Sequence, residues 1–360
     1  MLAGQVRDHE MILDHLAVLM RSEDLAYPCC QDYIHGSHNV GSFGSDGRMD
    51  EAWRRKLCDW SFSVVDHFEY DREVVSIAMN YLDRSMAVRT FSTNKTHQAT
   101  SKKDFQLLAI SSLYIAIKVH GQTERSNGAR MKMKLSAFVH LGRGMFPSQE
   151  IEASERQVLA DLNWRVNPPT TLRFLQNYLK LLPTWSRNGD LRSHDRVKNV
   201  IFEVARYMTE LSVCDSKFAF SLQASAVAYA SILCALDVLQ ENVVFPYEAR
   251  KNFLKNLAEA TGFVPQDPTI LKAVGMLKEL CPSMFQEGEI PCEFGFSQSW
   301  IVEDDAPTSM ASEGQGKASP ISVVNTTQVG YHEGPREEHS HNMNNHKRMR
   351  FSKSTDRNHA

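Results

Sequence analysis

The chain has 360 residues, which is enough for two or three domains. Its net charge of -3 and its 23% of charged residues are ordinary for a globular protein. They argue against a strongly basic surface that would bind nucleic acid or anionic membrane. No apolar run reaches the length of about 18 residues that a membrane span needs, and the first residues, MLAGQVRDHEM, are too polar for a signal peptide. We therefore expect neither nucleic acid nor membrane as a partner.

Cysteine usage indicates a reducing compartment. The seven cysteines are an odd number, no two form a C-x-x-C pair, and several fall inside apolar helical patterns. We therefore expect no disulfide framework and no zinc or other metal site. The cysteines are Cys29, Cys30, Cys58, Cys214, Cys234, Cys281 and Cys292.

Apolar residues recur with the helical period along the chain, and no alternating strand pattern appears. Residues 9–22 predict a short N-terminal helix, and residues 27–49 predict a loop because they hold Gly, Ser, Asn and Pro. Five helices are then expected at 51–68, 71–88, 102–119, 131–141 and 147–163.

The pair Pro168-Pro169 stops helix propagation, and a second set of five helices follows it. These are expected at 170–182, 192–213, 216–238, 246–260 and 267–280. After about residue 297 the chain is polar and charged and loses its apolar period, which predicts a disordered tail. The expected division is an N-terminal helix and loop (1–49), two five-helix units (50–166 and 167–285) and a tail (286–360), and the fold class is all-α.

Two helices of the first unit carry charges at the edge of an apolar face. Asp83 adjoins Leu82 on the second helix, and Arg54 lies three residues before Leu57 on the first. If the two helices pack antiparallel, Arg54 could meet Asp83 in a bidentate pair suited to a half-buried contact. The alternative is that both charges are solvated, and the spacing alone leaves both readings open.

Two further charges lie in line with apolar stripes. Lys118 falls three turns beyond Leu107 near the end of the third helix, where it either presents its ammonium at the rim or complements the helix dipole. Glu155 lies between Ile151 and Leu159 on the fifth helix, where it either binds a donor or stands at the edge of the stripe.

Four stretches of the sequence carry a family resemblance. They are WRRKLCDWSFSVV, VVSIAMNYLDRSMA, FQLLAISSLYIAIK and SERQVLADLNWRVNPPTTLRFLQNYL, with CDSKFAFSLQASAVAYASILCAL as a looser match in the second unit. The sequence resembles a cyclin. The five signature residues of that family are present in order, as Arg54, Asp83, Leu107, Lys118 and Glu155. The resemblance implies two tandem five-helix cyclin folds.

The resemblance also implies roles for these residues. Arg54 and Asp83 would form a structural ion pair, and Lys118 and Glu155 would face outward. In cyclins the latter two bind the regulatory C-helix of a cyclin-dependent kinase. Apolar neighbours would supply contact area around them, and the expected set is Leu107, Phe105, Leu108 and Ile151. The implied function is a regulatory subunit that activates a cyclin-dependent kinase as a heterodimer and controls cell-cycle progression.

A substrate-docking patch is a further implication of the resemblance. Its candidates are Trp53, Leu57, Trp60 and Gln106. Lys56 replaces an aliphatic residue and Trp53 a Met of the family pattern, so docking of R-x-L peptides is in doubt. Substrates and cyclin-kinase inhibitors remain candidate partners.

Short patterns and the tail refine these expectations. AMNYLDR and DSKF are similar to D-type cyclins, and no N-terminal destruction box appears, which favours G1 or G1/S. Ser319-Pro320 is a candidate phosphorylation site, and the basic cluster HKRMRFSK is a weak import signal, so we expect nucleus and cytoplasm.

A cyclin-fold transcriptional regulator or scaffold is the alternative, although such a protein should have basic repeats and often carries a zinc ribbon. An enzyme is not expected, because no Gly-rich phosphate loop, nucleophile elbow or metal-spaced cluster appears. No cofactor is expected either.

Overall fold

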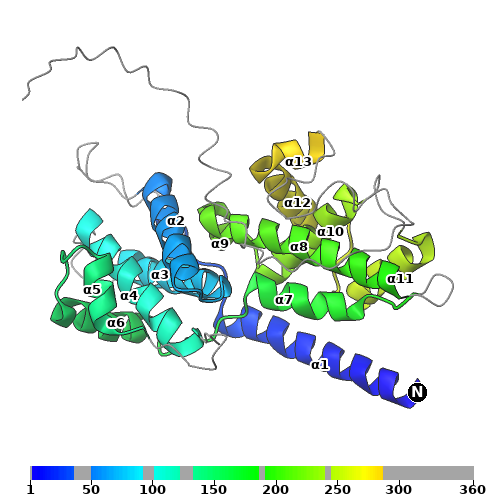
Figure 1. The fold of residues 1–360 in the computed structure, drawn as a ribbon, viewed down its shortest axis with the longest axis horizontal. Coiled ribbons are helices and arrows are strands. Elements are labelled where there is room, and N and C mark those ends of the chain that lie inside the picture. The colour runs from blue at the N-terminus through cyan, green and yellow to red at the C-terminus, as the bar shows by residue number, and fades with distance from the viewer. Residues whose placement is uncertain are drawn as a thin grey trace, which may run out of the picture.

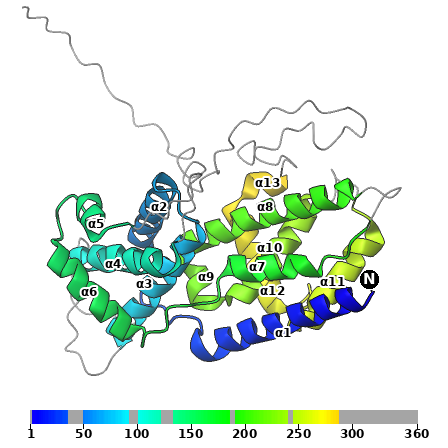
Figure 2. The ribbon, with the colours of Figure 1, turned by 60° about the horizontal axis from the view of Figure 1, so that its bottom comes forward.

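The computed structural model describes residues 2–35, 50–91, 101–121, 133–185, 191–239 and 245–286. Within these ranges the chain is helical and holds no strand, which confirms the all-α fold. Figures 1 and 2 show two helical bodies side by side, with one long helix running beneath the second. None of the helices in this part of the chain is long and apolar enough to cross a membrane.

The first body holds five helices. They are α2 (Glu51–His67), α3 (Glu73–Phe91), α4 (Lys102–His120), α5 (Leu135–Leu141) and α6 (Ser148–Asp161). Asp50 caps α2 by accepting the amide of Trp53, and Ser101 and Asp104 form a capping box at the start of α4. α4 packs between α3 and α6 and is buried along most of its length, so it forms the centre of this body.

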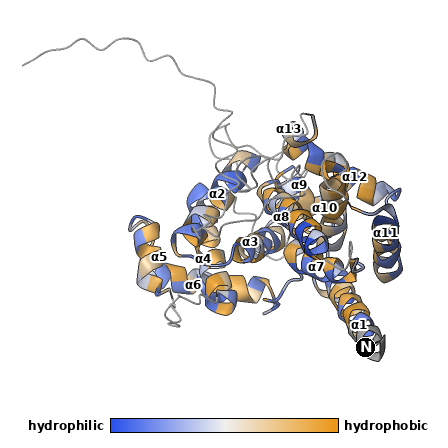
Figure 3. Cartoon of the chain, turned by 45° about the vertical axis from the view of Figure 1, so that its right-hand side comes forward, coloured by the Kyte–Doolittle hydropathy of each residue, from blue (hydrophilic) through white to orange (hydrophobic). Residues whose placement is uncertain are grey.

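The second body surrounds α10 (Ala224–Val238), whose side chains are almost all buried and which lies behind α8 in Figure 3. Around it lie α7 (Thr171–Tyr178), α8 (Arg192–Cys214) and α12 (Pro268–Leu280). The remaining elements are the 3-10 turn η2 (Leu179–Leu181), α9 (Ser216–Ser221), α11 (Tyr247–Thr261) and α13 (Pro282–Gln286).

The N-terminal helix α1 (Leu2–Ala26) belongs to the second body rather than to the first. Leu16 and Leu19 are buried in the core of the second body, and α1 contacts α7, α11 and η2. The following residues cross to the first body, where Tyr33 is buried among Phe105 of α4 and Phe220 of α9. The amino-terminal segment therefore joins the two bodies.

Two predicted elements differ from the structure. The predicted N-terminal helix at 9–22 is confirmed, but its bounds are too short, because α1 has 25 residues. The predicted single helix at 216–238 is wrong, because Leu222 adopts extended backbone angles and separates α9 from α10. α9 lies between the two bodies, with Phe218 in the core of the second and Phe220 against the core of the first, while α10 enters the core of the second.

Candidate functional site

Arg54 and Asp83 form a bidentate ion pair between α2 and α3. Arg54 Nε lies 2.9 Å from Asp83 Oδ1, and Nη2 lies 2.8 Å from Oδ2. Only 2% of each side chain is exposed. The Tyr33 hydroxyl donates to Asp83 at 2.8 Å, and Arg54 Nη1 donates to the Val213 carbonyl at 3.0 Å. The pair is therefore enclosed by protein groups and ties α2 and α3 to the end of α8.

Burial acts to lower the pKa of Arg54, but the facing Asp83 carboxylate outweighs it, and the pKa lies well above its usual value. Burial is also the main reason that the pKa of Tyr33 is raised well above its ordinary value, with Asp83 adding to it. Tyr33 therefore stays a neutral donor to a charged pair, which is the arrangement that a buried carboxylate needs.

Lys118 and Glu155 form a second pair, between the end of α4 and the middle of α6. Lys118 Nζ lies 2.7 Å from Glu155 Oε1 and 5.4 Å from the centre of the Tyr114 ring. The hydrogen bond from Glu155 raises the pKa of Lys118. The lysine side chain is 55% exposed and the glutamate 13%. The Lys118 ammonium is therefore at the surface, whereas the Glu155 side chain is mostly covered.

Three of the predicted apolar contacts cannot reach a partner. Phe105, Leu108 and Ile151 have 1%, 0% and 0% of their surface exposed and lie in the core of the first body. In this structure they offer almost no surface to a partner, and their role in kinase binding stays a prediction. Phe105 and Leu108 lie on the inward face of α4, and Ile151 lies on that of α6. Leu107 is half-buried and keeps some exposed surface.

Two exposed apolar residues near the pair were not singled out in the sequence. Trp164 is 72% exposed and Val119 is 48% exposed. The segments that carry them meet one or two residues further along the chain, since His120 Nε2 is 2.7 Å from the Val166 carbonyl. Trp164 has a φ of +59°, in a turn that directly follows α6. The signal in the sequence is that Trp164 falls just after the end of the predicted helix at 147–163.

The candidate docking patch occupies one stripe of α2 and the first turns of α4. Trp53, Trp60 and Gln106 are half-buried, whereas Leu57 is buried with 8% exposed. The ammonium groups of Lys56 and Lys102 lie 5.5 Å and 5.3 Å from the centre of the Trp53 ring. Leu57 therefore supports the patch from below rather than lining it.

Other predicted features bear on the site less directly. Ser319 and the basic cluster at 346–353 lie outside the described residues. Among the residues that are described, no group of His, Cys, Asp and Glu could hold a metal ion.

Comparison with known proteins identifies the region that carries both ion pairs. Residues 20–167 match the family model of the N-terminal domain of cyclins. This part of the chain is therefore similar to the N-terminal domain of cyclins. This match starts within α1 and spans all five helices of the first body.

Relatives support the cyclin family for the chain. The G1/S-specific cyclin-E of Caenorhabditis elegans is 24% identical, over 73% of this chain and 43% of its own length. Cyclin-D3-3 of Arabidopsis thaliana is 25% identical, over 61% of this chain and 54% of its own length. The G2/mitotic-specific cyclin-B1 of C. elegans is also 25% identical, over 69% and 61%. The chain spans about half the length of these curated relatives.

A solved structure extends the likeness to the second body. The X-ray structure of a viral cyclin from herpesvirus saimiri aligns with a TM-score of 0.50 and 17% identity. The alignment covers 76% of this chain and 97% of the viral protein. This coverage exceeds the first body, so the cyclin fold describes the arrangement of both.

Proposed function

We propose that this protein is a regulatory subunit that binds and activates a cyclin-dependent protein kinase. The observation that carries the proposal is the Lys118–Glu155 pair, which stands at the surface of a region similar to the N-terminal domain of cyclins. Both residues stand at the positions that the cyclin signature implies. A regulatory role of this kind requires no catalytic residues in the chain itself.

The geometry of the pair suits contacts to a partner's backbone. An ammonium has three donors, and Lys118 uses one on Glu155 Oε1. The remaining donors and the second carboxylate oxygen can meet carbonyl and amide groups at the ends of a docked helix. Trp164, Val119 and Leu107 have exposed apolar surface. They would form the apolar part of the contact in place of the buried predicted residues. Apolar contacts then supply affinity, and the charged pair sets the register.

Activation of the kinase would be allosteric. A subunit that binds better to the kinase state with its C-helix turned inward shifts the population toward that state. In that state the Lys–Glu ion pair of the kinase forms and its activation segment opens. The free energy available for the shift is the difference in affinity of this chain for the two states.

We further propose that the protein acts in G1 or at the G1/S transition and is present in nucleus and cytoplasm. AMNYLDR in α3 and DSKF at the start of α9 support a G1-type cyclin. The named relatives include both G1/S and mitotic cyclins at similar identity and do not distinguish between them. The proposed cell-cycle phase therefore depends on these two short stretches alone. Substrates and cyclin-kinase inhibitors are the further partners of the proposal.

Co-expression with a panel of cyclin-dependent kinases tests the function. The test variant exchanges the two charges, Lys118→Glu with Glu155→Lys, which keeps their mutual attraction and hence the local fold. The control exchanges the exposed pair Asp237–Lys278 of the second body, whose Oδ2 and Nζ atoms are 2.5 Å apart. We expect wild type and control to bind and activate a kinase, and the test variant to lose at least tenfold in affinity, because it presents reversed charges to the same partner groups.

The readouts are co-purification and phosphorylation of a generic substrate, with circular dichroism to check folding. If a folded test variant activates as well as wild type, the pair is not the contact. If no kinase of the panel binds wild type, the regulatory function itself is contradicted.

A further inference from the structure

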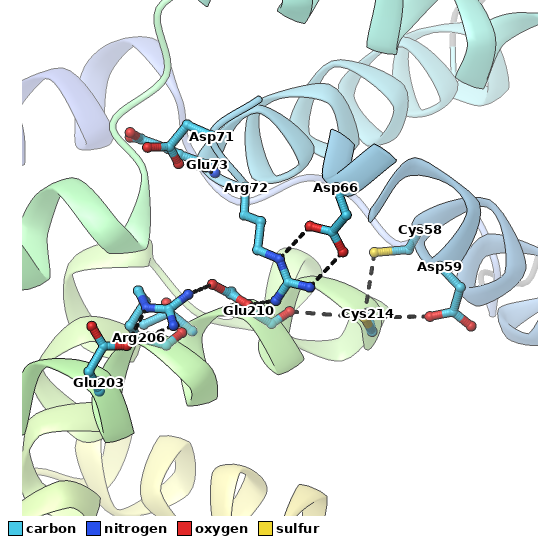
Figure 4. Close-up of polar contacts among 11 residues, drawn as sticks. Cys58, Asp59, Asp66, Asp71, Arg72, Glu73, Glu203, Arg206, Glu210 and Cys214 are labelled. Atoms are coloured by element: carbon cyan, nitrogen blue, oxygen red, sulfur yellow. Dashed lines mark hydrogen bonds and ion pairs between the residues drawn. The ribbon is translucent and has the colours of Figure 1, made fainter. Parts of the chain in front are cut away.

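Two cysteines meet across the interface between the two bodies. Cys58 lies in α2 of the first body, Cys214 is the last residue of α8 in the second, and 156 positions separate them in the sequence. Their sulfurs are 3.5 Å apart, and both are free thiols (Figure 4). A disulfide bond requires the sulfurs to approach to about 2 Å. Rotation of the two side chains about their first torsion angles moves the sulfurs by distances of this order.

A carboxylate beside the pair can accept a proton. The Cys58 thiol donates to the sulfur of Cys214. The Cys214 thiol in turn has two acceptors, the main-chain carbonyl of Glu210 at 3.9 Å and Asp59 Oδ1 at 4.0 Å. Burial raises the pKa of the Asp59 carboxyl above its ordinary value, which makes its carboxylate a stronger proton acceptor. Asp59 is half-buried and therefore connects the sulfur pair to the surface.

The two thiols differ in their access to solvent. None of the surface of Cys58 is exposed, whereas 4% of Cys214 is. Burial is the main reason that the pKa of Cys58 is raised well above its ordinary value, so Cys58 remains a neutral thiol. An oxidant reacts with the thiolate form of an accessible cysteine. Cys214, with its partial exposure and its contact to Asp59, is therefore the thiol that an oxidant reaches first.

We propose that Cys58 and Cys214 form a reversible disulfide bond when a hydroperoxide oxidises Cys214, and that this bond ties the two bodies together. In the first step the Cys214 sulfur attacks the peroxide O–O bond and becomes a sulfenic acid, while Asp59 passes the thiol proton to the leaving oxygen, which departs as water.

In the second step the Cys58 sulfur attacks the Cys214 sulfenic acid. The S–S bond forms, the S–OH bond breaks, and the Cys58 proton leaves with the hydroxide as a second water. The two thiols together lose two electrons and two protons, and one molecule of hydrogen peroxide becomes two molecules of water. A dithiol reductant reverses the reaction by thiol–disulfide exchange.

The position of the bond gives it a mechanical effect. Cys214 lies one turn beyond Glu210 on α8, and Glu210 accepts from Arg72 of the first body at 2.5 Å. The disulfide would add a covalent link to this polar contact. Because it joins residues that are far apart in the sequence, it restricts the unfolded chain strongly. We expect the oxidised protein to unfold at a temperature roughly 5–10 °C higher than the reduced protein.

Peptide mapping of the full-length protein tests whether the bond forms. Reduced wild type is exposed to hydrogen peroxide, quenched with catalase, alkylated in denaturant and digested without reductant. We expect mass spectrometry to find a cross-linked peptide pair that contains Cys58 and Cys214 and that dithiothreitol separates. Cys234 and Cys281 are the internal control. They are buried too, and burial raises the pKa of each to about 12, so they should be recovered as alkylated thiols.

Single variants test the order of the two steps. In Cys58→Ala the sulfenic acid has no thiol to meet, so dimedone should label Cys214, whereas in Cys214→Ala it should leave Cys58 unlabelled. Asp59→Asn should slow cross-linking at least tenfold, because the proton acceptor is lost. Glu248→Gln removes an exposed charge from α11, which lies at the opposite end of the molecule from α2 in Figure 1, and should leave the rate unchanged.

Thermal unfolding followed by circular dichroism tests the effect of the bond. Peroxide should raise the unfolding temperature of wild type and leave that of Cys58→Ala unchanged. All readouts are made on the free protein, so they do not depend on kinase binding.

Four results would contradict the proposal. The first is recovery of Cys58 and Cys214 as free thiols at a peroxide dose that oxidises the exposed Cys29. The second is equal oxidation of the buried control cysteines, since it would mean that peroxide acts on unfolded chains. A disulfide that leaves the unfolding temperature unchanged would refute the tie between the bodies, and cross-linking of Asp59→Asn at the wild-type rate would refute the assigned proton acceptor.

Discussion

Arg54 in the first turn of α2 and Asp83 in the middle of α3 are both buried, where an unpaired charge would be costly. Their bidentate pair, the Tyr33 hydroxyl and the Val213 carbonyl satisfy the buried groups. A complete buried pair of this kind adds little stability over apolar residues, but the loss of one partner is expensive. The pair therefore determines the orientation of α2 relative to α3, and adds little to the free energy of unfolding compared with apolar residues.

We predict that Asp83→Ala lowers the free energy of unfolding by about 3–5 kcal/mol, because it leaves the Arg54 guanidinium buried without its carboxylate. Urea denaturation followed by circular dichroism measures the change. The double variant Arg54→Met with Asp83→Leu should recover much of the loss, since it removes both charges. A single variant as stable as wild type would show that water reaches Arg54.

At the scale of the element, α1 shows how one helix divides between core and solvent. Leu16 is fully buried in the second body, whereas Val18 is 66% exposed two residues later. Glu23, on the inner side, accepts the Ser225 amide at 3.1 Å at the start of α10. Burial raises the pKa of Glu23, against the lowering effect of its bonds to Ser225. The helix is therefore an integral part of the second body.

We predict that Leu16→Ala destabilises the protein by about 2–5 kcal/mol, since it leaves a cavity where α1 packs. Val18→Ala is the matched control and should change stability by less than about 0.5 kcal/mol. Urea denaturation gives both values, and hydrogen exchange of the α1 amides reports whether the helix detaches. Equal effects of the two substitutions would contradict the packing of α1 described above.

At the scale of the whole molecule, Arg72 joins the two bodies (Figure 4). It binds Asp66 of α2 through Nε and Nη2, at 2.8 Å and 2.7 Å, and Glu210 of α8 through Nη1 at 2.5 Å. Burial raises the pKa of Glu210, although Arg72 and Arg206 both act to lower it. Nearby, the buried sulfurs of Cys58 and Cys214 lie 3.5 Å apart. The interface is thus buried and charged rather than a loose contact.

We predict that Arg72→Ala lowers the free energy of unfolding by about 3 kcal/mol, because Asp66 and buried Glu210 both lose a partner. Arg206→Ala should cost less, about 1 kcal/mol, since Arg206 is more exposed and bonds only within α8. Urea denaturation compares the two. A smaller effect of Arg72→Ala than of Arg206→Ala would mean that the bodies are held by other contacts.

The sequence alone determined the all-helical class and most helix positions, whereas the spacing left open whether Arg54 pairs with Asp83 and did not predict the Lys118–Glu155 pair. Apolar periodicity reports which residues form a helix, because it depends on local spacing. It placed Arg54 and Asp83 at facing stripe edges. It did not determine helix ends such as that of α1, which runs on to Ala26 because Leu19 and Glu23 find partners in the second body.

Only the tertiary structure decided which apolar residues face a partner. Phe105 and Trp164 are both large and aromatic, yet one is buried and the other 72% exposed. The break between α9 and α10 could not be predicted either, because it depends on contacts between distant parts of the chain. An apolar run through residues 216–238 is compatible with one helix, but Leu222 is extended, and α9 packs against both bodies whereas α10 packs only in the second. Exposure and direction depend on contacts between distant parts of the chain, and no local pattern records them.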